Sequence, residues 1–254
     1  MSSTFHVVVM IGARSSLVML RRAAGQMGKL RAIIFDVDGT LADTEKDGHM
    51  VACNEAFERM GFDIRWTWEE FKDLLKLPGN ARRMRMALST RTSLSRAEID
   101  RIVPELFALK KEIYLKRVGD LPLRPGVERI IREAIDRGVR LAIVSVSDEE
   151  QIRALLKAQL PGALEHFDPI LGKQSGEKTP ALYTSCAEKL GFETSGILVI
   201  EDSEKGFKAA KEAGLRCAMV YNDYTKGEDF SGAELVVRSL EFLNLDLLEQ
   251  LCLD

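Results

Sequence analysis

The sequence predicts an α/β fold, in which a doubly wound parallel sheet carries an inserted helical subdomain. Short apolar runs rich in valine and isoleucine alternate with amphipathic helical patterns through the second half of the chain. The connections between them are short, which is typical of parallel strands joined by helices. A long stretch of helical periodicity without a strand pattern follows the first apolar run, and this stretch predicts the insertion.

The expected strands are apolar runs, as in sheets that are buried on both faces. The first begins near Ile33, and the others span residues 139–145, 196–202, 216–221 and 233–237. Amphipathic helices are expected between them. Two of these helices end at Gly138 and Gly214, because glycine readily adopts the left-handed conformation that stops a helix.

The chain is expected to have three parts. Residues 1–28 form a leader or a disordered tail, residues 29–43 and 122–254 form the α/β core, and residues 44–121 form a helical cap. No acidic residue precedes Asp36, whereas several arginines and lysines do, which is the composition of an organelle-targeting leader. Translation from Met27 is the alternative. We therefore expect a cytoplasmic protein, or one in a plastid or mitochondrion if the leader is real.

The composition and net charge of the chain indicate which kinds of binding partner are not expected. The chain has 254 residues, a net charge of -3 and a pI near 5.8, which give no reason to expect nucleic acid or an anionic membrane as partner. No apolar stretch is long enough to cross a bilayer. The four cysteines are scattered without metal-ligand spacing and suit a reducing compartment. We expect a monomer.

Polar residues gather at the carboxyl ends of the predicted strands, and a lysine lies just before a later helix: Asp36, Asp38, Ser145, Ser147, Glu201, Asp202 and Lys178. In a parallel sheet these strand ends meet at one edge. Several carboxylates together call for a hard cation such as Mg2+. One carboxylate can attack phosphorus and another can move a proton, while serine hydroxyls and a lysine bind the phosphoryl oxygens.

Each of these features also has a simpler interpretation. The two aspartates could form a plain turn, the serines and the Glu-Asp-Ser run could only begin helices, and the lysine could lie on the surface. Their occurrence together, at the strand ends and just before a helix that can reach the same edge, favours phosphoryl transfer.

The stretches "FDVDGTLADTE", "IVSVS", "EKTP" and "IEDSEKGFKAAKEAG" resemble the four motifs of the haloacid dehalogenase-like hydrolase superfamily, in the subfamily with a helical cap. The resemblance implies a Rossmann-like core with Asp36 as nucleophile and Asp38 as general acid and base. It also implies that Ser145 and Lys178 bind the phosphoryl group. The implied Mg2+ ligands are Asp36, the main-chain carbonyl of Asp38, and Asp202, with Glu201 in support.

One departure from the family pattern concerns the lysine. The family usually follows it with Pro-x-Pro and an acidic residue, but "KTPALY" is shorter and has Leu182 near the acidic position. Lys173 is therefore a rival for the phosphate-binding role. Lys178 is preferred because a proline, at position 180, and a helix follow it closely.

Other stretches resemble the CbbY-like branch, which includes phosphatases of xylulose 1,5-bisphosphate: "DTEKDGH", "WTWEEFKDLLK", "LPLRPGV" and "YTKGEDFSGAELV". Relatives carry Lys-Glu-Arg where this chain has Ala81, Arg82 and Arg83. The resemblance implies that Glu45 contacts substrate hydroxyls and that Arg83 binds a sugar-phosphate oxygen. A run of arginines without acids in the cap agrees with an anion site, although most of them could also form a solvated helix face.

The predicted function is a Mg2+-dependent phosphatase acting on a small sugar phosphate or bisphosphate through an aspartyl-phosphate intermediate. A phosphomutase resembling beta-phosphoglucomutase is the alternative enzyme, because the motifs do not reveal whether water or a sugar hydroxyl receives the phosphoryl group. A sugar-phosphate-binding module without catalysis is a third class. It would be expected to lack Asp36, Asp38 or Asp202, and all three are present.

Overall fold

The computed structural model describes residues 30–253, so the predicted leader lies outside the described residues. The chain divides into two compact units. Residues 43–122 form the cap, and the described residues on either side of them form the core. Within residues 30–253, no helix is both long and apolar enough to cross a membrane.

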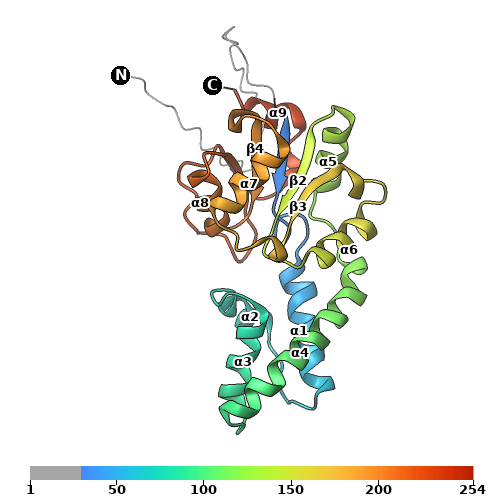
Figure 1. The fold of residues 1–254 in the computed structure, drawn as a ribbon, viewed down its shortest axis with the longest axis vertical. Coiled ribbons are helices and arrows are strands. Elements are labelled where there is room, and N and C mark those ends of the chain that lie inside the picture. Colours follow the sequence, from blue (N-terminus) through green and yellow to red (C-terminus); the bar gives the residue numbers. More distant parts are fainter. Residues whose placement is uncertain (1–29, 254) are drawn as a thin grey trace. The chain divides into compact units, whose positions relative to one another are not determined.

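The core is built on a parallel sheet of six strands in the order β3-β2-β1-β4-β5-β6 (Figure 1). In register, Phe35 at the end of β1 pairs with Ile143 of β2 and with Ile200 of β4, so these strands end at nearly the same level. The predicted doubly wound parallel sheet is confirmed. The strands are β1 (Ala32–Phe35), β2 (Arg140–Val144), β3 (Phe167–Leu171), β4 (Ile197–Glu201), β5 (Arg216–Val220) and β6 (Leu235–Val237).

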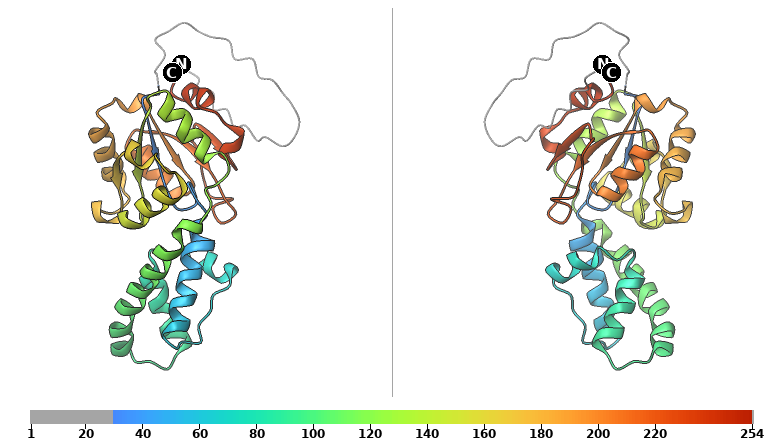
Figure 2. Two further views of the ribbon diagram at one scale, coloured as in Figure 1. Left: turned by 90° about the vertical axis from the view of Figure 1, so that its right-hand side faces the viewer. Right: turned by 90° about the vertical axis from the view of Figure 1, so that its left-hand side faces the viewer.

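Helices cover both faces of this sheet (Figure 2). Alternate strand residues on one face, such as Ile34 and Val199, pack with the buried faces of α7 and α8 in one apolar cluster. Gly138 and Gly214 adopt left-handed φ values of 68° and 75°, as expected of residues that end helices. The core helices are α5 (Val127–Asp136), α6 (Glu149–Gln159), α7 (Pro180–Leu190), α8 (Glu204–Glu212) and α9 (Leu245–Gln250), with short 3-10 turns at Leu164–His166, Lys173–Ser175, Thr194–Gly196 and Leu240–Phe242.

Strand β3 is the one strand that the sequence pattern did not predict. Its sequence, "FDPIL", interrupts the apolar run with an aspartate and a proline. A proline cannot donate a ladder hydrogen bond, so within sheets it is confined mainly to edge strands. β3 is such an edge strand, because it pairs only with β2.

The unit of residues 43–122 consists of helices and the loops that connect them. Its helices are the π-helix η1 (Glu45–Met50), α1 (Val51–Arg59), α2 (Trp68–Leu74), α3 (Asn80–Arg91) and α4 (Arg96–Arg117), followed by a 3-10 turn at Val118–Asp120. Capping boxes begin α2 at Thr67 and α4 at Ser95. Trp66 packs between Phe57 and Phe71, with ring centroids 5.1 and 5.5 Å away, and anchors the core of this unit.

Candidate active site

The order of the strands brings the polar strand ends together. β1 lies between β2 and β4, and the sheet grows from it in both directions. Ligands of open α/β sheets bind beyond the carboxyl ends of the strands, where the order reverses in this way. Asp36 follows the last residue of β1, and Asp202 follows the last residue of β4. The two aspartates, 166 positions apart in sequence, therefore lie at the same place.

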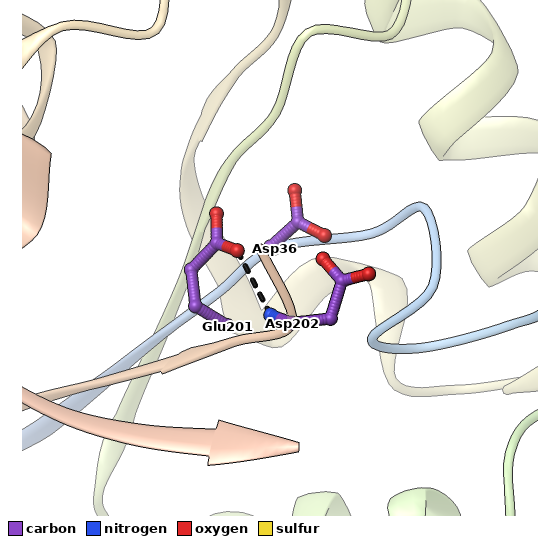
Figure 3. A group of neighbouring side chains, drawn as sticks. All are labelled: Asp36, Glu201 and Asp202. Atoms are coloured by element: carbon purple, nitrogen blue, oxygen red, sulfur yellow. Dashed lines mark hydrogen bonds between the residues drawn. The ribbon is translucent and has the colours of Figure 1, made fainter. Parts of the chain in front are cut away.

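Three carboxylates form the centre of the site: Asp36, Glu201 and Asp202 (Figure 3). Each offers an oxygen that lies within 4.8 Å of the oxygens of the other two. They are 4%, 0% and 3% exposed, so water does little to screen their mutual repulsion. Burial, with the charges of Asp36 and Glu201, raises the pKa of Asp202 well above its usual value. A cation at this cluster would offset the repulsion among the three carboxylates.

Lys178 supplies part of that positive charge. Its Nζ lies 2.5 Å from Asp36 Oδ1 and also donates to Glu201, and its side chain is 6% exposed. Burial alone would lower the pKa of Lys178, but the charges of Asp36 and Glu201 outweigh it and raise the pKa. One lysine does not balance three carboxylates. Burial still raises the pKa of Asp36 to about 7, although Lys178 opposes that shift.

The position of Lys178 separates the two lysines that the sequence left as rivals. Lys178 is buried against the carboxylates, whereas Lys173 is exposed in a 3-10 turn. Leu182, at the position where the family usually has an acidic residue, is packed into the apolar cluster of the core. The structure thus brings Lys178, the preferred lysine, to the site. The position at which the family usually has an acidic residue is an apolar core position in this chain.

Glu201 is held firmly by the start of α8. Its Oε2 accepts from the main-chain nitrogens of Asp202 and Ser203, at 2.8 and 2.9 Å. Its Oε1 accepts from Lys178 and from the Tyr183 hydroxyl, the latter at 3.2 Å. Although burial acts in the opposite direction, Lys178 and these donors lower the pKa of Glu201. Glu201 is therefore a charged residue that locks the lysine and the β4–α8 turn in place.

Asp38 faces a pair of serines. Its Oδ2 lies 2.5 Å from the Ser147 hydroxyl and 3.4 Å from the Ser145 hydroxyl. Ser145 is completely buried, and its oxygen also accepts from the main-chain nitrogen of Ser147 at 3.1 Å. The side chain of Asp38 lies outside the carboxylate cluster, and the role of its main-chain carbonyl as a metal ligand stays a prediction.

The turn after β1 is held by two residues, Arg124 and Asn222, that were not among the predicted site residues. Arg124 donates to the carbonyl of Gly39 and, at 2.9 Å, to that of Val220. Asn222 donates to the Gly39 carbonyl at 3.3 Å and to Asp202 at 2.7 Å. Arg124 lies within "LPLRPGV", and Asn222 directly follows a predicted strand, so the strand-end rule could have found the asparagine.

Gly39 itself has a conformation and a neighbourhood that require glycine. Its φ of 86° lies in the left-handed region. A Cβ at this position would come within 2.1 Å of the Tyr224 hydroxyl and 2.3 Å of Asp202 Oδ2. The turn that follows the two aspartates is therefore packed directly against the carboxylate cluster.

The two candidate residues of the cap contact each other. Arg83 Nη1 lies 3.5 Å from Glu45 Oε2, and the Arg83 side chain is 6% exposed. Its Nε also donates to the carbonyls of Leu74 and Leu77, each at 3.0 Å, and its guanidinium lies over the Phe71 ring. Arg83 thus braces the connection between α2 and α3, and its predicted contact with substrate stays a prediction.

The other arginines of α3 include surface ion pairs. Arg85 pairs with Asp100, and Arg91 lies 2.8 Å from Glu70, with both partners of each pair well exposed. These two arginines therefore follow the simpler interpretation of a solvated helix face.

The carboxylate cluster fits a hard divalent cation. Its donors are all oxygens, as Mg2+ prefers. Asp36 Oδ2 is buried and has no hydrogen-bond partner within residues 30–253. Buried polar atoms are nearly always paired, so this oxygen is the one available to a cation or to phosphorus. Asp36 and Asp202 are the residues that would hold the metal, with Glu201 beside them.

The family model described as haloacid dehalogenase-like hydrolase matches residues 33–220. A CbbY protein of Cereibacter sphaeroides is 37% identical over 218 residues, which cover 83% of this chain and 92% of that protein. A CBBY-like protein of Arabidopsis thaliana is 34% identical over 215 residues, covering 81% and 67% of the two chains. The crystal structure of a CbbY variant from Rhodobacter sphaeroides in complex with xylulose-(1,5)bisphosphate matches with a TM-score of 0.73 and 32% identity, covering 84% and 95%.

Proposed function

The chain belongs to the haloacid dehalogenase-like hydrolase family as a phosphatase related to the CbbY proteins, and from this premise we propose that it hydrolyses a small sugar phosphate through a phosphorylated Asp36. The observation that carries the proposal is the state of Asp36. One of its oxygens is bound by Lys178, while the other is buried without a hydrogen-bond partner in the described part of the chain. Such an oxygen is suited to attack an electrophile.

In the first step Asp36 attacks phosphorus, and the bond between phosphorus and the sugar oxygen breaks. Asp38 gives a proton to the leaving oxygen, so that the sugar departs as a neutral alcohol. Lys178 and the hydroxyls of Ser145 and Ser147 bind the phosphoryl oxygens and orient them. Bound Mg2+ would offset the charge of the phosphoryl oxygens and of the carboxylates.

In the second step a water molecule attacks the phosphorus of the aspartyl phosphate, and Asp38 accepts its proton. The bond between phosphorus and Asp36 breaks, which releases inorganic phosphate and restores the carboxylate. The proposal is supported by the hydroxyls that hold Asp38, because a fixed carboxylate can exchange one proton in each direction.

For the substrate we propose a sugar mono- or bisphosphate, with xylulose 1,5-bisphosphate as the first candidate. The support is the likeness to the CbbY protein whose crystal structure contains that compound. Within the cap, the proposed substrate contacts are Glu45 and Arg83. The cap motif of this chain differs from that of the relatives, because Ala81 replaces a lysine. The substrate could therefore differ from theirs in its sugar.

The test is a phosphate-release screen over sugar mono- and bisphosphates with and without Mg2+, using Asp36→Asn as the inactive control. Release from xylulose 1,5-bisphosphate that needs Mg2+ and is lost in Asp36→Asn is the expected result. If beta-glucose 1-phosphate is converted to the 6-phosphate without phosphate release, the enzyme is a mutase and the hydrolysis proposal fails. Binding without turnover of any substrate would instead favour a sugar-phosphate-binding module.

A further inference from the structure

The loop after β5 lies against the carboxylate cluster and has no role in the steps above. It leads into the stretch that resembles the CbbY-like branch, which starts at Tyr224, and Asn222 is the second residue after β5. Asn222 is 8% exposed. Its Nδ2 donates to Asp202 Oδ2 at 2.7 Å and to the Gly39 carbonyl at 3.3 Å, so one amide group joins β4, the turn after β1 and the β5 loop.

The orientation of this amide is determined by its other end. The Oδ1 atom accepts from the main-chain nitrogens of Tyr224 and Thr225 and from the Thr225 hydroxyl, each at 3.1 Å. An atom surrounded by donors has to be the oxygen, so the NH2 group must face Asp202. The Thr225 hydroxyl also accepts from the main-chain nitrogen of Asn222, which fixes the threonine rotamer.

Asp202 needs such a donor. Its carboxylate is 3% exposed and lies beside the charges of Asp36 and Glu201, which repel it. The hydrogen bond from Asn222 acts against that repulsion and holds one carboxylate oxygen in a single position. Mutation of a residue that orients a metal ligand in this way typically weakens metal binding by about 10- to 100-fold.

We propose that Asn222 is a positioning residue, which holds Asp202 in the arrangement that binds the divalent cation, and that Thr225 sets the orientation of Asn222. This inference rests on the proposed function, in which Asp202 is a metal ligand. It assigns the β5 loop to metal affinity rather than to contact with the sugar.

The primary variant is Asn222→Leu, which keeps the size of the side chain and removes its amide. We would measure Mg2+ dissociation constants by calorimetry on the full chain, and melting temperatures in EDTA. The matched control is Asn54→Leu in the cap, because the amide of Asn54 likewise joins main-chain groups, at Trp66, but lies outside the core.

Mg2+ binding that is about 10- to 100-fold weaker in Asn222→Leu, but unchanged in Asn54→Leu, is expected. Turnover of Asn222→Leu should approach that of the wild type once Mg2+ saturates, since Asn222 touches no reacting atom. A purely structural role would lower the melting temperature and leave the Mg2+ affinity unchanged, and that result would overturn the inference.

Two more variants keep the outcome decisive. Thr225→Val removes one hydroxyl and keeps the amide of Asn222, so this variant should bind Mg2+ several-fold less tightly than the wild type. It can be measured even if Asn222→Leu does not fold, and an unchanged Mg2+ affinity would then refute the proposal. Asp202→Asn tests the premise. If Asp202→Asn loses Mg2+ binding while both loop variants retain it, the positioning role of Asn222 is refuted but the metal site is not. If Asp202→Asn binds Mg2+ as the wild type does, Asp202 is not a metal ligand and the proposed metal site is refuted.

Discussion

Replacing Lys178 tests the charge balance of the candidate site most directly. In Lys178→Met the chain keeps a side chain of similar length but leaves Asp36, Glu201 and Asp202 without their one lysine. Asp36 and Glu201 are 5% and 0% exposed at the side chain, so neither carboxylate can regain its hydration. Removing one partner of a buried ion pair costs about 3–5 kcal/mol, because the other charge stays buried.

That cost should be visible in thermal and urea unfolding of the metal-free protein. For a chain of this size it corresponds to a melting temperature about 6–20 °C lower. Lys173→Met is the matched control: it removes an exposed lysine of the loop that precedes α7, and surface changes of this kind usually stay within about 0.5 kcal/mol. Saturating Mg2+ should restore part of the loss in Lys178→Met, since the cation replaces the missing positive charge.

The reasoning would be refuted if both variants unfolded at the same temperature in EDTA. It would also fail if Lys173→Met abolished phosphate release while Lys178→Met retained it, because Lys173 would then be the phosphate-binding lysine.

Three further predictions concern packing around the site and elsewhere. In Gly206→Ala the new Cβ would lie 1.8 Å from Glu201 Oε1, so we expect destabilisation of about 1–3 kcal/mol in urea unfolding, and no change would contradict the close packing at the start of α8. Burial raises the pKa of the Cys53 and Cys186 thiols to about 12, so at pH 8 they stay protonated and should react with a thiol reagent only after denaturation; rapid reaction of the native protein would show that they are accessible. Arg83→Lys keeps the charge but loses the planar donors to two main-chain carbonyls, so it should lower the melting temperature even without substrate, and an unchanged melting temperature with a raised KM would assign Arg83 to the substrate alone.

Much of the core was predictable because its signals are local. Apolar runs of four to five residues mark strands buried on both faces, and glycines such as Gly138 and Gly214 mark helix ends. The rule that parallel strand ends share an edge then brings Asp36 and Asp202 together without any coordinates. The edge strand β3 was not predicted, because Asp168 and Pro169 interrupt its apolar run. An edge position in a sheet tolerates such residues.

The sequence by itself determined the fold class, the strand-end carboxylates and the family of this protein. The local pattern favoured Lys178 over Lys173, but only the tertiary structure showed that Lys178 is buried against the cluster while Lys173 is exposed. It also revealed the hydrogen-bond partners of Asn222, which lie 20 and 183 positions away in the sequence. Hydrogen bonds over such separations depend on how strands are ordered in the sheet, and no local pattern of residues encodes that order.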